Sequence, residues 1–490
     1  MQHHQRCHRP LFCALNQCVS PAIHRNCTNL FIAHSTHQNA SKQLDFAGVL
    51  FKITDLWHDE RLEIYSKRLI KLAFIIFNEC PIHGKGMVFP FNTTNTTWKI
   101  CLILALGAFS MGNAKYSIIQ LMPIIANDLQ VPIREIQKAV VAYFWGGLLG
   151  APLFAIVCRN WKKHSILVFL SVWCFLGNLS SSFASNADIL MVLRFLSGMP
   201  HGAFLALAVL SMASATSAQH MGRSIGIILM GVAIATVFAA PFNAWIGETQ
   251  SWQTAFRFVA LCDILIALLV HDCLPKEREQ PQRISVGNLL KSLHSKPVWL
   301  VLLLNASITA CVTSVWSFSV LILSTHAEVP HNLGFIATMV LATGFLCGQL
   351  IGTYIANGRT HRSIGWACAG AVVCSTLIWL SMSQYQLALA FIFLLNVTLM
   401  INILIQVHLL HLTTGRRYLV FCMLNSAIFI GNFAGTLSSD AVLQLTGKNH
   451  SILILSIVFA IIALLAWAFL NQLHDDCKQQ KQQAALKIQP

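Results

Sequence analysis

The sequence predicts an all-α membrane protein with twelve transmembrane helices in two six-helix pseudo-repeat halves. Three observations predict this fold class. Long apolar segments follow one another from Trp98 onward, basic loops occupy every second gap, and one long basic gap divides the segments six and six. Charged residues are only 10% of the chain and hydrophobic residues are 56%, whereas soluble domains have about 25% charged residues. This composition excludes two soluble domains, which the length alone would suggest.

Each apolar segment is long enough to cross the hydrocarbon core, which takes roughly 20 residues in a helix. Because lipid offers no partners to backbone polar groups, such segments must be helical. The twelve predicted spans are residues 99–122, 139–158, 165–184, 189–213, 223–246, 255–274, 298–323, 333–356, 364–383, 386–410, 419–445 and 451–471. An even number of spans puts both termini on the same side of the membrane.

The charges between the spans predict which side that is. The gaps after spans 2, 4, 6, 8 and 10 hold Arg159, Lys162, Lys163, Arg223, Lys276, Arg278, Arg283, Lys291, Lys296, Arg359, Arg362, Arg416 and Arg417. The opposite gaps hold only Arg134, Lys138, Lys448 and the borderline Arg257. Cytoplasmic loops carry an excess of Lys and Arg, so we expect both termini in the cytoplasm. The same pattern explains the net charge of +15 without a nucleic-acid partner.

The polar, basic gap 275–297 divides the chain into an N-terminal half, 99–274, and a C-terminal half, 298–471. Two six-helix halves joined by a long cytoplasmic linker are typical of secondary transporters built from parallel repeats. A weak internal similarity supports the repeat, because Gly150 and Gly352 each lie near the end of a span before a basic loop. The tail 472–490 is rich in Gln and Lys and is expected to be disordered.

The extension 1–98 has a different composition. Its first 86 residues hold eight of the twenty His and five of the sixteen Cys, and its apolar stretch 69–77 is too short to span. No second ligand pair follows His3, His4, Cys7 and His8 at zinc-finger spacing, so no metal site is predicted. We expect a disordered or loosely folded segment, or a true start of the protein at Met87.

Motifs for catalysis and metal binding are missing from the sequence. There is no P-loop, no H-E-x-x-H and no G-x-S-x-G, so neither an enzyme nor a bound cofactor is predicted. The cysteines show no C-x2-C spacing, and many lie inside apolar spans, where a thiol acts as a small hydrophobe. The cysteines within spans include Cys174, Cys262, Cys311, Cys347, Cys368 and Cys374.

Span 4 carries a motif of a different kind. Arg194, Gly198 and Gly202 recur every four residues and share one helix face, and small residues at this spacing allow helices to approach closely. Span 5 follows with Gly231, Ala240-Pro241 and Gly247. This run resembles the major facilitator superfamily, within it the twelve-span drug:proton antiporter group, and especially the arabinose, sugar and purine efflux branch.

Further stretches carry the resemblance, which covers about residues 99–471. Residues Gly112–Tyr116 read Gly-Asn-Ala-Lys-Tyr, where the branch has Gly-Thr-Thr-Glu-Phe, and Leu-Met-Pro at Leu121–Pro123 resembles its Leu-Leu-Pro. Gly150–Leu153 leads into the basic loop after span 2. Span 11 holds Leu-Asn at Leu424–Asn425 and Gly-Asn-Phe-Ala-Gly at Gly431–Gly435. Five weak motifs in the right order make a strong signal together.

The resemblance implies a secondary transporter that works by alternating access, with a site near the bilayer midplane. We expect a monomer in the inner or plasma membrane that exports a small drug, sugar or nucleoside-like compound in exchange for protons. In the family, Gly150, Arg159, Lys162 and Lys163 belong to the gate, and Gly231, Pro241 and Gly247 would permit close packing and bending. An uptake permease or facilitator, or a membrane sensor that does not transport, would fit the sequence as well.

Two positions depart from the family pattern. The loop after span 2 usually has an Asp before its basic cluster, and here that position is Cys158. Span 1 often has an acidic residue as a proton or cation site, and here that position is Lys115. Counted along their helices, Lys115, Arg194 and Asp263 lie at similar depth in the outer half of the membrane. Asp263 could pair with one cation as a structural bond, or a cation could remain for an anionic group of the substrate.

The remaining candidates are polar or aromatic residues inside spans. His201 shares a face with Arg194 and is, after Asp263 and Lys115, a third candidate for proton coupling. Spans 1, 4, 7 and 10 line the cavity in the family, but bonds between helices would leave the same pattern in the sequence. The candidate lining residues are Asn113, Tyr116, Asn305, Thr309, Trp316, Asn402, Gln406, His408, Asn425 and Asn432.

Overall fold

The computed structural model describes residues 95–275, 287, 293, 295–323, 333–356, 360–382, 384–413 and 417–486. The chain divides into two units, Met1–Lys85 and Gly86–Pro490, and the first lies wholly outside the described residues. The predictions for Met87, for nearly all of the extension 1–98 and for most of the linker 275–297 therefore fall outside the description. The fold is that of the second unit.

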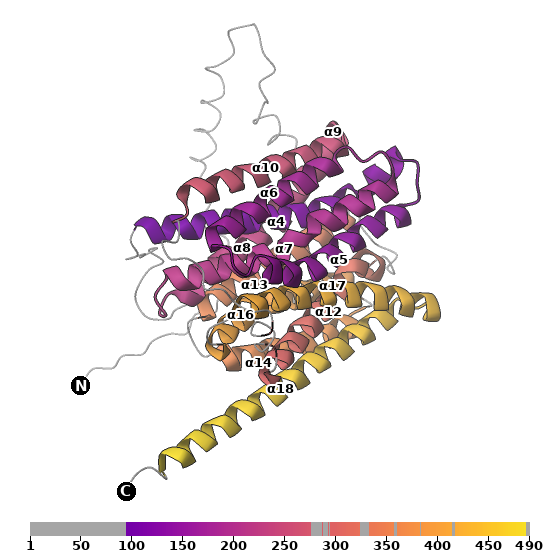
Figure 1. Cartoon of the computed structure of the whole chain (residues 1–490). Coiled ribbons are helices and arrows are strands. Elements are labelled where there is room, and N and C mark those ends of the chain that lie inside the picture. The colour runs from indigo at the N-terminus through magenta and orange to yellow at the C-terminus, as the bar shows by residue number, and fades with distance from the viewer. Residues whose placement is uncertain are drawn as a thin grey trace, which may run out of the picture. The chain divides into compact units, whose positions relative to one another are not determined.

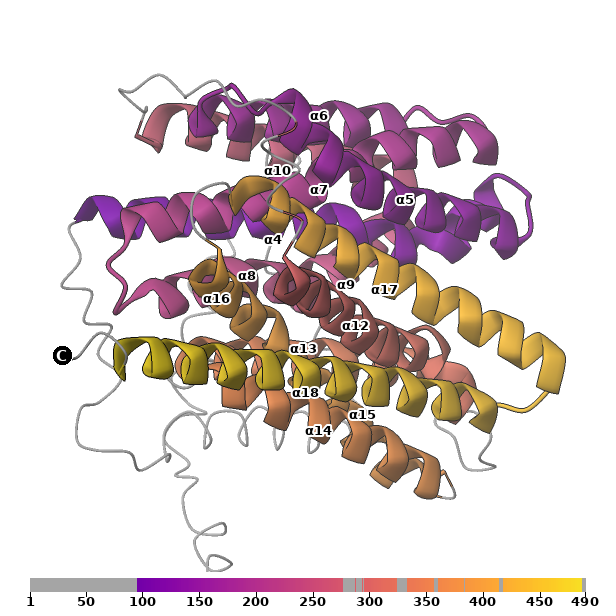
Figure 2. The ribbon, with the colours of Figure 1, turned by 60° about the horizontal axis from the view of Figure 1, so that its bottom comes forward.

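Twelve segments of the described chain are helical, long and apolar enough to cross a membrane, as the sequence predicts. The first half comprises α4 (Asn95–Asp128), α5 (Ile133–Val157), α6 (Lys163–Ser181), α7 (Ala187–Ala215), α8 (Met221–Ile234), η1 (Ala235–Ala239), α9 (Ala240–Thr249) and α10 (Trp252–Cys273). The second comprises α12 (Lys296–Leu323), α13 (Leu333–Ile355), α14 (Thr360–Leu380), α15 (Tyr385–Val397), η3 (Thr398–Met400), α16 (Ile401–Leu412), α17 (Arg417–Thr446) and α18 (His450–Leu486). Figure 1 shows these helices side by side in one bundle, and Figure 2 shows α12 beside α17 and α18.

Two of the helix boundaries that differ from the predicted ones have clear local reasons. Helix α5 begins at Ile133 rather than at residue 139, because its polar first turns are helical too and hold an ion pair of 2.7 Å between Lys138 and Glu135. Helix α18 continues to Leu486, so the disordered tail predicted from residue 472 is corrected to helix over 472–486. Gln, Lys, Ala and Leu, which make up most of this stretch, are good helix formers.

Side chains placed at the first turns define where several helices begin. The side chain of Asn186 accepts a hydrogen bond of 2.8 Å from the backbone N–H of Ile189 at the start of α7. Ser251 accepts one of 3.2 Å from the N–H of Thr254 at the start of α10. Both bonds satisfy a backbone donor that has no partner within the helix, which is why Asn and Ser favour this position.

The glycines of α5 and α7 form a close seam between the two helices, and the spacing on span 4 predicts such a close approach. A methyl group added at Gly146 would overlap the carbonyl oxygen of Phe195, and one at Gly150 would overlap Met199. In the opposite direction, a methyl group at Gly198 would overlap the carbonyl oxygen of Tyr143. The two backbones therefore touch directly, which only glycine allows.

The second half repeats this seam with its own glycines. Gly344 and Gly348 on α13 lie against the carbonyl oxygens of Phe393 and Val397 on α15, and Gly352 lies against that of Met400 on η3. Gly150 and Gly352, which carry the weak internal similarity in the sequence, thus make equivalent contacts between the second and fourth spans of their halves. This supports the repeat that the sequence predicts.

The fifth span is interrupted by the π-helical turn η1, which comes directly before Ala240-Pro241. Proline has no N–H to continue an α-helical ladder, and π-turns accommodate such local irregularities and often occur at functional sites. Gly231, just before the turn, lies against the carbonyl oxygen of Ala105 on α4, and Gly247, beyond it, lies against the side chain of Leu121. The glycines of the fifth span therefore allow it to pack closely against the first span.

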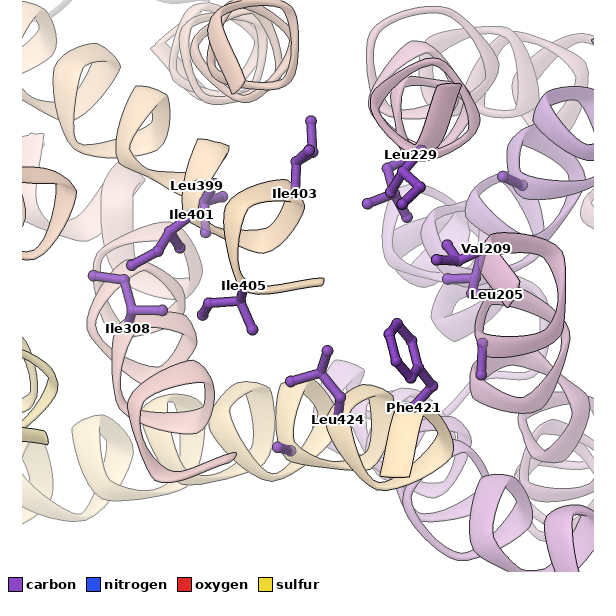
Figure 3. Packing of buried hydrophobic residues seen from close by; sticks show 14 of the residues in the cluster. Leu205, Val209, Leu229, Ile308, Leu399, Ile401, Ile403, Ile405, Phe421 and Leu424 are labelled. Atoms are coloured by element: carbon purple, nitrogen blue, oxygen red, sulfur yellow. The ribbon is translucent and has the colours of Figure 1, made fainter. Parts of the chain in front are cut away.

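The two halves meet along α5 with α17 and along α8 with α13. Ser426 on α17 donates a hydrogen bond of 2.8 Å to the carbonyl oxygen of Leu148 on α5. Gly226 on α8 lies against Thr353 on α13. Buried apolar side chains fill the region between these contacts, and Figure 3 shows Leu205, Val209 and Leu229 of one half opposite Ile403, Phe421 and Leu424 of the other.

Candidate functional site

The first half contains a buried polar network centred on the carboxylate of Asp263 on α10, which is 1% exposed. The hydroxyl of Ser110 on α4 donates a bond of 2.6 Å to its Oδ1, and Nδ2 of Asn178 on α6 donates one of 2.6 Å to its Oδ2. A carboxylate removed from water needs such donors, because burial without them is very unfavourable. The network therefore joins the first, third and sixth spans.

Arg194 on α7 completes this network from the other side. Its Nη2 donates a bond of 2.8 Å to Oδ1 of Asn178, and its Nε donates one of 3.1 Å to Ser181. The guanidinium also lies 4.5 Å above the ring of Phe256, a favourable cation–π geometry. Arg194 and Asp263 are linked through Asn178 rather than by a direct ion pair, since no carboxylate of the described residues lies within ion-pair distance of this guanidinium.

Lys115 has very different surroundings, although it lies on the same helix as Ser110. Its Nζ lies 4.9 Å from the ring centroid of Tyr116, 5.8 Å from that of Phe144 and 5.9 Å from that of Phe429. Its hydrogen bond to the hydroxyl of Tyr116 is long, at 3.5 Å. The ring of Tyr116 in turn stacks on Trp316, with centroids 6.2 Å apart. Lys115 is thus half-buried among aromatic rings of both halves.

His201 lies beside this aromatic group. Its Nδ1 is 2.9 Å from the hydroxyl of Tyr143, and its ring meets that of Phe429 edge to face, with centroids 5.3 Å apart. A neutral hydrogen bond and ring packing satisfy a histidine without any proton transfer. The contacts of His201 therefore need no proton transfer, and its part in proton coupling stays a prediction.

The other predicted polar site residues differ in what they contact. Asn305 donates a bond of 3.2 Å to the carbonyl oxygen of Leu424, and Asn432 accepts one of 2.9 Å from Thr313, so both join α12 to α17. Asn425 donates to a carbonyl of its own helix at 2.9 Å. Oδ1 of Asn402 and Oε1 of Gln406 on α16 have no hydrogen-bond donor among the described residues, and neither has Oδ1 of Asn305. The network around Asp263 does not include these side chains.

Asn113 lies on the side of α4 that faces the fifth span. It accepts a bond of 2.6 Å from Asn243 on α9, and both side chains are fully buried. This pair holds the helix that carries Lys115 next to the π-turn η1. Asn113 is therefore a contact between helices rather than part of the aromatic group.

The loop after α5 keeps its cysteine buried. Cys158 is fully buried at the end of α5, and this burial raises the pKa of its thiol. The neighbouring Arg159 donates a bond of 2.8 Å from Nη1 to the carbonyl oxygen of Ile156. Lys162 precedes α6 and Lys163 begins it, so the basic cluster lies at the α5–α6 turn. Its role in gating stays a prediction.

Several residues that make these contacts were missed by reasoning from the sequence. Asn178, Ser110 and Asn243 are single polar residues in apolar spans, and nothing in one sequence shows which neighbouring helix each of them faces. Phe144 and Phe429 have no distinguishing pattern among thirty phenylalanines.

A sequence profile described as Major Facilitator Superfamily matches residues 104–436, most of the chain. The chain belongs to the major facilitator superfamily. The match confirms the resemblance seen in the motifs. It also makes the chain a multi-pass transporter rather than an enzyme.

Curated relatives extend over most of the chain. The inner membrane transport protein YdhP of Escherichia coli K12 is 26% identical over 372 residues, 74% of this chain and 93% of that protein. The chloramphenicol resistance protein of Streptomyces lividans is 23% identical over 379 residues, covering 74% and 94%. A probable sugar efflux transporter of Pasteurella multocida is 21% identical over 368 residues, covering 74% and 90%.

Solved structures share the fold. The proton:xylose symporter XylE superimposes with a TM-score of 0.66 at 12% identity, covering 76% of this chain and 96% of that one. The Escherichia coli fucose:proton symporter FucP gives 0.63 at 12% identity, covering 76% and 99%. The predicted fold class is therefore confirmed.

Proposed function

We propose that this chain is an inner-membrane secondary transporter that exports a small molecule by alternating access, with protons as the coupling ion. Relatives named for chloramphenicol resistance and for sugar efflux support export. The contacts along α5 with α17 and α8 with α13 would be the surfaces on which the halves rock. The glycine seams support this movement, because they let each half move as one body.

The observation that carries proton coupling is the buried carboxylate of Asp263. Its partners Ser110 and Asn178 are neutral, so uptake of a proton breaks no direct ion pair. The hydroxyl of Ser110 can donate to a carboxylate and accept from a carboxylic acid, so the contact can persist in both states. The charge of Arg194, two hydrogen bonds away through Asn178, favours the release of that proton again.

Protonation of Asp263 would be felt on the helix that carries Lys115. Ser110 is on α4, five residues before Lys115, which corresponds to about 7.5 Å along a helix. When the bond from Ser110 changes direction, the neighbouring turn of α4 has to accommodate the change. Asp263 is thus the candidate proton carrier, and the first span connects it to the region between the halves.

Transport into proteoliposomes, with and without a pH gradient, tests this proposal. We expect gradient-driven flux for the native chain, loss of its gradient dependence in Asp263→Asn, and retention of exchange at equal pH. Asp188→Asn is the matched control, since Asp188 is an exposed carboxylate in the first turn of α7. Flux that ignores the gradient in the native chain would indicate a facilitator. Absence of flux across a broad compound panel would indicate the membrane sensor.

A further inference from the structure

The ammonium group of Lys115 has no anionic partner within the described residues. No carboxylate of the described helices lies within ion-pair distance of its Nζ, and its hydrogen bond to Tyr116 is long, at 3.5 Å. The buried acid Asp263 accepts hydrogen bonds from Ser110 and Asn178, and Asn178 links it to the positive charge of Arg194. The polar network is therefore balanced, whereas the positive charge of Lys115 is not.

The rings around this charge come from both halves of the protein. Tyr116 and Phe144 belong to α4 and α5, and Phe429 and Trp316 belong to α17 and α12. Phe144 and Phe429 also contact each other, with centroids 6.2 Å apart. Tyr116 and Trp316 are partly exposed and offer flat apolar surfaces next to one positive charge, whereas Phe144 and Phe429 are buried. A group bound here would touch both halves at once, as alternating access requires of a substrate.

We propose that Lys115 and these four rings bind the substrate, and that the substrate is an organic anion with an aromatic or similarly flat apolar body. The proposal rests on the transport function proposed above, since it names the substrate class. The ammonium group takes the carboxylate or other acidic group as a point charge. The partly exposed rings of Tyr116 and Trp316 take the apolar body, and the buried rings of Phe144 and Phe429 complete the apolar surroundings of the ammonium group.

Charge decides which compounds this site would reject. A cationic compound would place its charge next to the ammonium group of Lys115, where water is partly excluded and repulsion is strong. A neutral isostere would pack against the rings but leave the ammonium group without an anionic partner. A membrane potential that is negative inside also favours the outward movement of an anion. The site and the direction of export are therefore consistent with the same substrate class.

The competing explanation is that Lys115 is held by the rings alone. Cation–π contacts stabilise a lysine at such distances, and then Lys115 would contribute to stability but not to selectivity. The two explanations differ in what they predict for pairs of compounds that share a ring system and differ only in charge. A structural lysine gives equal binding of both members.

The test uses the purified full chain and a panel of aromatic carboxylates, such as benzoate and 2-naphthoate, each paired with its neutral amide. Binding is measured from the quenching of tryptophan fluorescence and from thermal stabilisation, and transport is measured in proteoliposomes. We expect carboxylates to bind at least tenfold more tightly than their amides. This preference should disappear in Lys115→Met and remain in Lys115→Arg. Lys138→Met is the matched control, because Lys138 is exposed and paired with Glu135.

Each outcome bears on the proposal separately from the transport function. If amides bind or move as well as their carboxylates while gradient-driven flux persists, the anionic substrate class is refuted and the transporter stands. If neither series nor any other compound moves, the transport function fails and this inference fails with it. The comparison of carboxylates with amides in the native chain needs no variant, so it decides the question even if Lys115→Met does not fold.

Discussion

The asparagine between the buried carboxylate and the buried guanidinium offers the sharpest test of the polar network. Asn178 donates to Asp263 at 2.6 Å and accepts from Arg194 at 2.8 Å, and Asn178→Ala removes both bonds. Hydrogen bonds to charged groups contribute about 1.5–3 kcal/mol each in soluble proteins. Bonds between helices in membranes contribute about 0.6 kcal/mol on average and at most about 1.7 kcal/mol. The membrane values apply here and predict a loss of about 1–3 kcal/mol.

The assay is the free energy of unfolding, measured by titration with SDS in mixed micelles. Asn396→Ala is the matched control, because Asn396 is equally buried but its Nδ2 bonds only a carbonyl oxygen of its own helix, Ile392 at 2.9 Å. The double variant Asn178→Ala/Asp263→Asn should lose less than the sum of its single variants, since both remove the same bond. If Asn178→Ala loses no more stability than Asn396→Ala, Asn178 does not stabilise the bundle as a bridge.

Three further predictions concern single residues. Gly198→Ala should lower the melting temperature of the purified protein, because its methyl group would overlap the backbone of α5. In the control Gly370→Ala, the nearest atom to the added methyl group is 3.7 Å away. Its stability should therefore be unchanged or rise by up to about 1 kcal/mol from helix propensity. The raised pKa of the Cys158 thiol leaves less thiolate at neutral pH, so Cys158 should react with N-ethylmaleimide far more slowly than the exposed Cys273. Mass spectrometry would record both rates, and equal rates at pH 7 would contradict the burial of Cys158. Gly226→Val should leave the protein folded but reduce flux in proteoliposomes, because the added side chain pushes α8 away from α13 at a contact between the halves; unchanged flux would exclude this contact from the transport cycle.

The spans could be read from the sequence because the bilayer imposes their length and the loops carry the charge. The close approach of α7 to another helix could be read as well, since small residues four apart have a direct geometric meaning. That the other helix is α5 could not be read. The partners of Asp263 could not be read. A membrane helix is apolar on all sides, so periodicity does not reveal which face of α6 meets α10, and Asn178 has no signature of its own.

The structure also separates two charges that the sequence placed together. Lys115, Arg194 and Asp263 were expected at similar depth, and depth follows from counting residues along a helix. Which of the two cations faces the acid depends on how α4 and α7 are rotated about their axes. Side-chain packing sets that rotation, and the structure places Arg194 with the acid and Lys115 with the rings. A single sequence does not show which of the two cations faces the acid.

The two sides of a glycine seam differ in how strictly the contact constrains their amino acids. Gly146 and Gly198 must remain glycine, because any side chain would overlap a main-chain carbonyl oxygen. The residues across the seam supply only main-chain atoms to the contact, and every amino acid has these. As far as the seam is concerned, Phe195 and Tyr143 are therefore free to drift over evolutionary time. Distant homologues would then share the spacing of small residues long after the side chains facing them have changed beyond recognition.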